Sequence, residues 1–219
     1  MNLRLLQLVS PSLPVGAYSY SQGLEAAIEA QVVKDADSAG AWIGDVMQLA
    51  IGAMEAPVFL RLAGAWARGD LDAVREWNAL FIASRETAEL RAETLQMGYS
   101  LRTLLRDLPL GGAEALDEFE ELAFPAAFTF AVVQWEIEPG EALQAYLFGW
   151  LENQVLAAVK AVPLGQTQAQ RLLLDLAARI PALVTAAERV GDQDIGNFAP
   201  GLAILSSRHE TQYSPLFRS

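Results

Sequence analysis

Apolar side chains recur at intervals of three or four residues along most of this 219-residue chain. That spacing places them on one face of an α-helix, and it is clear from Leu71 to Leu108 and from about Thr167 to Val190. Turn-forming residues interrupt the pattern at Gly69-Asp70, near Ser84 to Thr87, and at Pro109 to Gly112. The pattern therefore predicts several helices joined by short turns.

One segment has the composition of a strand. Residues Phe124 to Val133 combine aromatic side chains with adjacent valines, which are common in strands. No second segment of this kind offers a pairing partner, so we predict a buried helix here. The chain is accordingly predicted to form one all-α domain over residues 1–219. We expect a single-domain helical bundle with an irregular N-terminal loop region at 1–24 and a C-terminal tail at 191–219.

Proline and acidic residues suggest further details of the helices. Pro57 is expected to bend or break the apolar helix that begins near Asp35, and Pro181 is expected to kink the last long helix. A short acidic helix is expected from Glu114 to Leu122, and another helix from about Ser21 to Ala30.

The helix predicted from Pro139 to about Ala161 is apolar around almost its whole circumference. Such a helix must be covered on more than one side. It is either the central helix of the bundle or shared between the core and a subunit interface. We expect a symmetric homodimer in which a face near Tyr146 and Phe148 meets its twin.

The stretch from Ser10 to Glu25 avoids helical periodicity yet keeps apolar side chains. Two prolines and two glycines predict a structured loop that turns sharply. One interpretation is a turn that leads into a helix and packs two tyrosines, Tyr18 and Tyr20. The other is a surface for a partner, because rigid aromatic side chains contribute contact area at little entropic cost.

Composition narrows the class of partner and the compartment. The formal net charge of −12 would repel nucleic acid and anionic membranes, so we expect protein or cationic partners. The absence of cysteine excludes disulfides and thiolate metal sites and is compatible with a reducing cytoplasm. No apolar run has the length and flanks of a membrane span or signal peptide. We expect a soluble cytoplasmic protein.

Catalytic chemistry has few candidate residues. His209 is the sole histidine, so neither a hydrolase triad nor a permanent transition-metal site can be assembled. A phosphate-cradling Gly-x-x-x-x-Gly-Lys-Ser/Thr motif is missing as well. Two sets of carboxylates could bind a hard cation weakly: Glu118, Glu120 and Glu121, or Glu86, Glu89 and Glu93. A solvated helix face explains either set more simply, so a non-enzymatic binding protein without a cofactor is favoured over an all-helical carboxylate enzyme.

Several unusual stretches follow one known pattern. The first is Ser-Pro-Ser-Leu-Pro-Val-Gly-Ala-Tyr-Ser-Tyr-Ser-Gln-Gly-Leu-Glu at 10–25, and the others are Trp77-Asn78, Ser84-Arg85-Glu86-Thr87, Gln96-Met97-Gly98, Gln154 to Gln170, and Arg208 to Ser214. Together they resemble the urease accessory protein UreF family over essentially the entire chain. One position departs from it. Pro215 stands where the family usually has arginine, which removes a bidentate donor and a backbone N–H from the tail.

The resemblance implies an all-α dimer that acts as a chaperone for nickel insertion into urease and is not itself an enzyme. It implies binding to UreD and recruitment of the GTPase UreG to the urease apoprotein. Because the chain lacks ligands for a stable nickel site, we expect nickel to pass transiently through the complex. The residues expected at the partner surface lie between Ser10 and Glu25, before Pro163 and in the tail: Tyr18, Tyr20, Glu25, Lys160, Arg208, His209, Glu210, Tyr213, Phe217 and Arg218.

Two further expectations concern regulation. The protein is alternatively an activator or checkpoint of the UreG GTPase, with Lys160 as the residue of interest. An ordinary lysine near a helix C-terminus, favoured by the macrodipole, is the simpler explanation of Lys160.

The tail has too little apolar pattern around Tyr213 and Phe217 to fold on its own, so it is expected to be mobile until UreD binds.

Overall fold

A computed structural model describes residues 2–218, and every regular element within them is helical. The elements in chain order are α1 (Leu3–Leu8), η1 (Ala17–Ser19), α2 (Leu24–Glu29), α3 (Ala36–Val46), η2 (Met47–Glu55), α4 (Ala56–Arg68), α5 (Leu71–Ala83), α6 (Ala88–Asp107), η3 (Ala113–Glu118), α7 (Phe124–Gln134), α8 (Pro139–Ala161), α9 (Gln166–Ala177), α10 (Ile180–Arg189), η4 (Asp192–Asp194) and α11 (Pro200–His209). Element η2 is π-helical, and η1, η3 and η4 are 3₁₀ turns. The predicted all-α class is confirmed.

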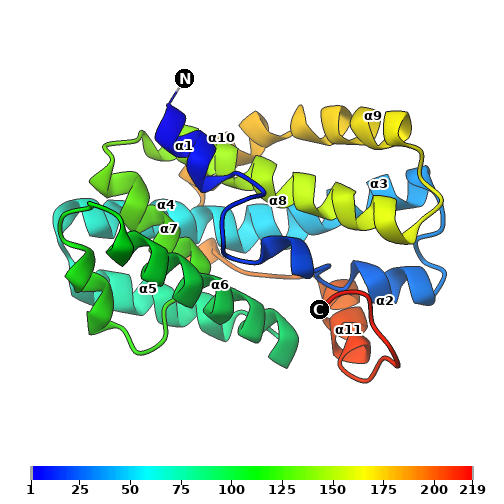
Figure 1. Ribbon diagram of the computed structural model, residues 1–219, viewed down its shortest axis with the longest axis horizontal. Helices are drawn as coiled ribbons and strands as arrows, with labels where there is room; N and C mark the ends of the chain where they lie inside the picture. The colour runs from blue at the N-terminus through cyan, green and yellow to red at the C-terminus, as the bar shows by residue number, and fades with distance from the viewer. Residues whose placement is uncertain (1, 219) are drawn as a thin grey trace.

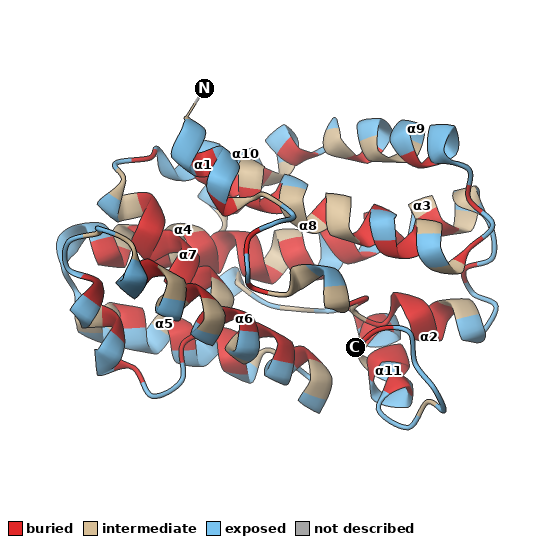
Figure 2. Ribbon diagram, viewed as in Figure 1, coloured by how far each residue is buried: buried red, intermediate tan, exposed pale blue. Residues whose placement is uncertain are grey.

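Helix α7 lies between α4 and α6 in one half of the molecule (Figure 1). Every residue from Pro125 to Val132 is buried, as the red colour of this helix shows in Figure 2. Neighbouring helices therefore cover the apolar side chains of α7 on all sides. This explains why a segment with strand-like composition is helical, as predicted.

Helix α8 crosses the molecule and packs against α2, α4, α9 and α10. Glu138 caps it by accepting hydrogen bonds from the N–H groups of Gly140 and Glu141. The apolar circumference of α8 is thus covered within the chain on several sides. A subunit interface is not needed to explain it.

Pro57 does not break the helix in which it lies. Helices α3 and α4 continue into one another through the π-helical η2, from Ala36 to Arg68. Proline has no N–H to donate to the carbonyl four residues earlier, and the Ala53 carbonyl accepts instead from the N–H of Gly196 at 3.4 Å. By length and composition this helix could cross a membrane, but 72% of its apolar window is buried inside the protein, as in a core helix.

Other predicted boundaries are corrected. The last long helix is divided into α9 and α10, with Pro181 in the first turn of α10. The acidic segment forms only the short η3 turn. Helix α2 begins at Leu24 because Gly23 adopts a left-handed conformation with φ 77°. The C-terminal region contains α11, which the sequence pattern did not predict.

Candidate functional site

Glu25, in the first turn of α2, holds the C-terminal tail in place. The backbone N–H groups of Leu216 and Phe217 donate to its Oε1 and Oε2 at 2.7 and 2.9 Å. The side-chain amide of Gln212 donates to Oε1 at 3.2 Å. Glu25, which was expected at a partner surface, is only 6% exposed in this structure, because its carboxylate is occupied by the chain's own tail.

His209, at the end of α11, joins Glu25 to a second carboxylate. Its Nε2 lies 3.2 Å from Glu25 Oε2 and its Nδ1 lies 2.9 Å from Glu89 Oε2. The residue is 2% exposed, so it is also not available to a partner. We call Glu25, Glu89 and His209 the tail anchor, because they connect α2, α6 and α11 beneath the tail.

The end of the tail lies against the opening loop, which we define as residues 10–23. The N–H of Arg218 donates to the carbonyl of Ser19 at 2.8 Å. Phe217 is 7% exposed, and the ammonium group of Lys160 lies 5.4 Å from the centroid of its ring. Phe217 is therefore an internal residue of this docked segment and not a surface residue as predicted.

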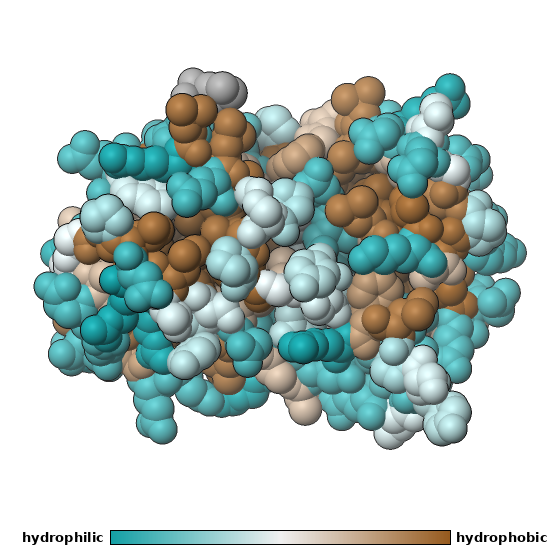
Figure 3. All heavy atoms as spheres, in the orientation of Figure 1, coloured by the Kyte–Doolittle hydropathy of each residue, from teal (hydrophilic) through white to brown (hydrophobic). Residues whose placement is uncertain are grey.

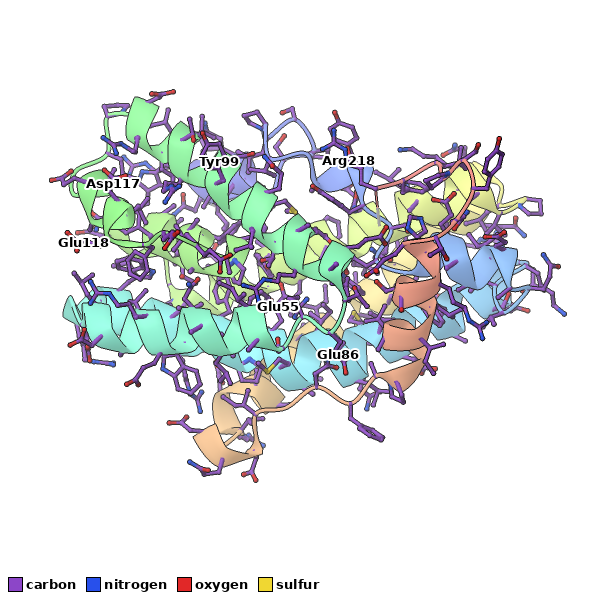
Figure 4. All side chains as sticks on the ribbon, turned by 90° about the horizontal axis from the view of Figure 1, so that it is seen from below. Glu55, Glu86, Tyr99, Asp117, Glu118 and Arg218 are labelled. Carbon is purple, nitrogen blue, oxygen red and sulfur yellow. The ribbon has the colours of Figure 1, made fainter. Side chains whose placement is uncertain are left out.

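Tyr20 is buried as well, at 5% exposure. Burial raises the pKa of its hydroxyl, against the opposing effect of a hydrogen bond with the Arg218 side chain. Figure 4 shows Arg218 beside the opening loop. The structure thus supports the packed-tyrosine interpretation for Tyr20 and corrects its assignment to the partner surface.

The structure places the tail against the chain itself, whereas a mobile segment was expected. Hydrophobic periodicity in the sequence can reveal an apolar helix face, but the tail is not attached through such a face. Its attachment depends on two backbone N–H groups that pair with a buried carboxylate, and on one aromatic ring. Charge-assisted hydrogen bonds of this kind are about twice as strong as neutral ones.

The other predicted partner residues lie at the surface. Tyr18 is 61% exposed and Tyr213 is 96% exposed. The remaining exposed residues are Lys160, Arg208, Glu210 and Arg218. Figure 3 shows the face that carries the opening loop and the tail, where apolar and polar side chains alternate. The tail anchor thus lies beneath an exposed surface that contains both apolar and polar side chains. We call this surface the tail face, and its residues are Tyr18, Lys160, Tyr213, Leu216 and Arg218.

A second polar cluster, which sequence reasoning missed, lies in the middle of the bundle. Glu55 accepts a hydrogen bond from the hydroxyl of Tyr146, and its other oxygen lies 3.4 Å from Nη2 of Arg85. Figure 4 shows Glu55 among the helices. Burial and the neighbouring Glu55 carboxylate raise the pKa of Tyr146 well above its ordinary value. An isolated acidic residue within an apolar stretch was the available signal for Glu55.

A cavity of about 120 Å³ connects this cluster to the opening loop. Gln22 bridges the two regions. Its amide donates to Glu93 at 2.8 Å and its carbonyl accepts from the indole N–H of Trp150 at 2.7 Å. Gln22 adopts φ 50°, an uncommon value for a residue other than glycine. Two side-chain hydrogen bonds of Gln22 therefore attach the opening loop to α6 and α8, and the backbone of Gln22 takes an uncommon conformation there.

The predicted dimer face is corrected in part. Tyr146 is 7% exposed and packs against the rings of Phe59, Phe124 and Phe128. Its hydroxyl pairs with Glu55 in the core, so Tyr146 is not part of the exposed surface of α8. Phe148 is 38% exposed and remains a surface residue.

Five of the six carboxylates considered for cation binding already have partners, among them Glu89 with His209 and Glu93 with Gln22. Glu118 pairs with Arg75, Glu121 with Arg91, and Glu86 accepts from Asn197. Across residues 2–218, no three His, Asp or Glu side chains converge where a metal ion could be held.

Comparison with known proteins agrees with the resemblance seen in the sequence. The UreF family model matches residues 33–177. The urease accessory protein UreF of Azoarcus sp. strain BH72 is 56% identical over 222 residues, which cover 99% of this chain and 95% of that protein. The UreF proteins of Methylobacillus flagellatus and Dechloromonas aromatica are 55% and 54% identical, each over 99% of this chain and 97% and 96% of their own lengths. This chain therefore belongs to the UreF family of urease accessory proteins.

Proposed function

We propose that this protein is a non-enzymatic cytoplasmic scaffold in urease maturation, which binds UreD and recruits the GTPase UreG to the urease apoprotein for nickel insertion. The observation that carries the proposal is the tail face. Tyr18, Tyr213 and Leu216 are 61%, 96% and 73% exposed, although the segments that hold them are fixed by internal hydrogen bonds. Exposed aromatic and apolar groups on a fixed backbone favour protein binding, because little ordering is required when they are covered. Membership of the UreF family supports the same role.

The fixed backbone also separates two tasks. Glu25 and His209 hold the tail from below, while the side chains of Tyr213 and Leu216 point away from them into solvent. A partner can therefore contact the exposed side chains without displacing the anchor. Surface substitutions should change binding while leaving the fold intact.

Tyr18→Ala and Tyr213→Ala are each expected to weaken UreG recruitment about tenfold, the typical cost of removing an aromatic anchor from an interface. The measurement is co-purification of UreG with this protein and UreD, followed by titration of the complex. Tyr99→Ala is the matched control, because Tyr99 is a tyrosine of similar exposure, 57%, on α6. Well-folded proteins that form no complex, or tail-face variants that recruit as the control does, would contradict the proposal.

A second candidate role is regulation of GTP hydrolysis by UreG. The observation that favours it is the contact of Lys160 with Phe217, which links the end of α8 to the tail. The ammonium group of Lys160 is part of the tail face, the surface that we propose binds partner proteins. The measurement is the rate of GTP hydrolysis by UreG with and without this protein. A rate that changes with the wild type and returns to its basal value with Lys160→Ala would identify a regulator. An unchanged rate would mean that the protein acts as a scaffold and does not regulate hydrolysis.

We propose a homodimer that uses the outer stripe of α8 around Phe148. Phe148→Glu is expected to halve the mass measured by light scattering, because a buried unpaired carboxylate opposes association. Leu80→Glu is the control, since Leu80 on α5 is 42% exposed and lies outside this stripe. A monomeric wild-type protein, or a dimer that persists in Phe148→Glu, would reject this interface.

A further inference from the structure

The cavity beside the opening loop is large enough to hold a small organic molecule. Its volume is about 120 Å³, and an apolar cavity of about 150 Å³ holds benzene. Its walls are formed by the opening loop and by residues of α6, α7 and α8. Two wall residues, Tyr18 and Leu156, are 61% and 43% exposed. The cavity therefore reaches the surface of the protein, where a ligand can enter it.

Aromatic rings form much of the wall. Phe124 and Phe128 on α7 contact Tyr146 on α8, with ring centroids 5.7 and 5.0 Å from that of Tyr146. Trp150 follows one turn after Tyr146 on α8 and also lines the cavity. Aromatic rings pack against apolar groups, and their faces attract cations. The wall therefore suits a ligand with an apolar body and does not oppose a positive charge on it.

The charged residues of the wall are mainly acidic. Three carboxylates, those of Glu55, Glu93 and Glu152, line the cavity together with one guanidinium, that of Arg85. When all four groups are ionised, the wall carries a net charge of −2. Arg85 lies 3.4 Å from Glu55 and over the ring of Phe81, so the one positive group is already paired with an acid of the same wall. Charge complementarity therefore favours a cationic ligand.

Tyr146 shows how this environment acts on a group in the wall. Burial raises the pKa of its hydroxyl most, and the carboxylates of Glu55 and Glu93 raise the pKa further, against the opposing effect of Arg85. A negative charge is thus disfavoured at this place. By the same argument, the cavity should reject an anionic ligand.

A bare metal ion does not fit this wall. Metal ions in proteins are held by several ligands that converge on one point, and the described residues 2–218 contain no such set of three His, Asp or Glu side chains. A cation that carries its own apolar body does not need convergent ligands, because the aromatic and aliphatic wall can enclose it.

We propose that this cavity is a binding site for a small organic ammonium ion whose apolar body is about the size of a benzene ring. Aromatic and aliphatic side chains enclose the apolar body, and the carboxylates of Glu93 and Glu152 attract the ammonium group. The ligand lies between the opening loop and helices α6 and α8, which Gln22 already connects through its hydrogen bonds. The site is a property of this chain alone and does not depend on the proposed function.

NMR of isotope-labelled methionine methyl groups in the full chain tests the site. Met97 lines the cavity, Met47 is buried outside it, and Met97→Leu assigns the Met97 signal. Benzylammonium, which is charged at neutral pH, is expected to shift the Met97 signal with a dissociation constant below about 1 mM and to leave Met47 unchanged. Benzyl alcohol, which is neutral and of nearly the same size, should bind about tenfold more weakly. Benzoate should not bind.

Glu93→Gln separates the charge of the cavity from its shape. Glutamine keeps an oxygen that can accept a hydrogen bond from Gln22, but one negative charge is lost. The affinity for benzylammonium is expected to fall about tenfold, while the affinity for benzyl alcohol stays the same. Glu120→Gln is the matched control, because it removes the same charge from an exposed residue outside the cavity. It should leave both affinities unchanged.

Equal affinities of the wild type for benzylammonium and benzyl alcohol would overturn the proposal, because the cavity would then select for size and not for charge. A Met97 signal that does not shift with benzylammonium would overturn it as well, and so would equal losses in Glu93→Gln and Glu120→Gln. The comparison of the three ligands uses the wild type, so it decides the question even if Glu93→Gln does not fold. No partner protein is needed, so failure of this site is distinct from failure of UreG recruitment, which the tyrosine variants test separately.

Discussion

Gly98→Ala is expected to destabilise the protein by about 3 kcal/mol or more, enough to leave much of a marginally stable protein unfolded. A Cβ at this position of α6 would lie 1.9 Å from the carbonyl oxygen of Leu122 and 2.9 Å from the carbonyl carbon of Ala123. Both are backbone atoms just before α7, so neither can move without separating the two helices. Urea denaturation of wild type and variant measures the loss.

Gly201→Ala provides the control for this prediction. Gly201 lies in α11, and no atom lies within 4 Å of the Cβ that alanine would add. Its stability should stay within about 1 kcal/mol of wild type and change in the stabilising direction, because alanine is the better helix former. Equal unfolding midpoints for the two variants would show that α6 and the start of α7 are further apart than in this structure.

Arg85→Met is expected to cost about 3–5 kcal/mol, because it leaves the Glu55 carboxylate buried without its cation. The side chains of Arg85 and Glu55 are 9% and 7% exposed, and the Arg85 guanidinium lies 4.2 Å from the ring centroid of Phe81. Methionine keeps much of that packing and removes the charge. The loss therefore reports the unpaired carboxylate, and chemical denaturation measures it.

A second substitution separates charge from packing. Glu55→Gln added to Arg85→Met should recover more than half of the loss, because neither position then carries a charge and Tyr146 can still donate to the amide oxygen. Arg91→Met is the exposed counterpart. Its pair with Glu121 is about half exposed on both sides, so the cost should stay below about 1 kcal/mol. Similar losses of unfolding free energy for Arg85→Met and Arg91→Met would show that the Arg85–Glu55 pair is no more important for stability than an exposed pair.

The sequence predicted the helices well where periodicity and composition act locally. The helix at Pro139 to Ala161 was predicted with its boundaries, because proline in the first turn and a proline after the end mark both ends. The buried helix α7 was predicted because a lone strand has no partner.

The site was less predictable because its contacts join distant parts of the chain. The tail anchor brings together residues 25, 89 and 209, and no local pattern specifies such a contact. The family resemblance assigned Glu25 and His209 to the partner surface, and nothing in the local sequence indicated that they would be buried. The motif resemblance selected the right segments but could not separate the residues that fasten them from those that face outward.

The π-helical segment from Met47 to Glu55 sets the rotational phase of the long helix beyond it. A hydrogen bond that spans five residues in place of four takes up one residue more, and one residue corresponds to about 100° around an α-helix. Phe59 and Leu62, which are fully buried, therefore point in directions that an uninterrupted α-helix from Ala36 would not give them. The orientation of α4 in the core thus depends on the length of a segment that precedes it, and a shift of one residue there would act on every contact that α4 makes.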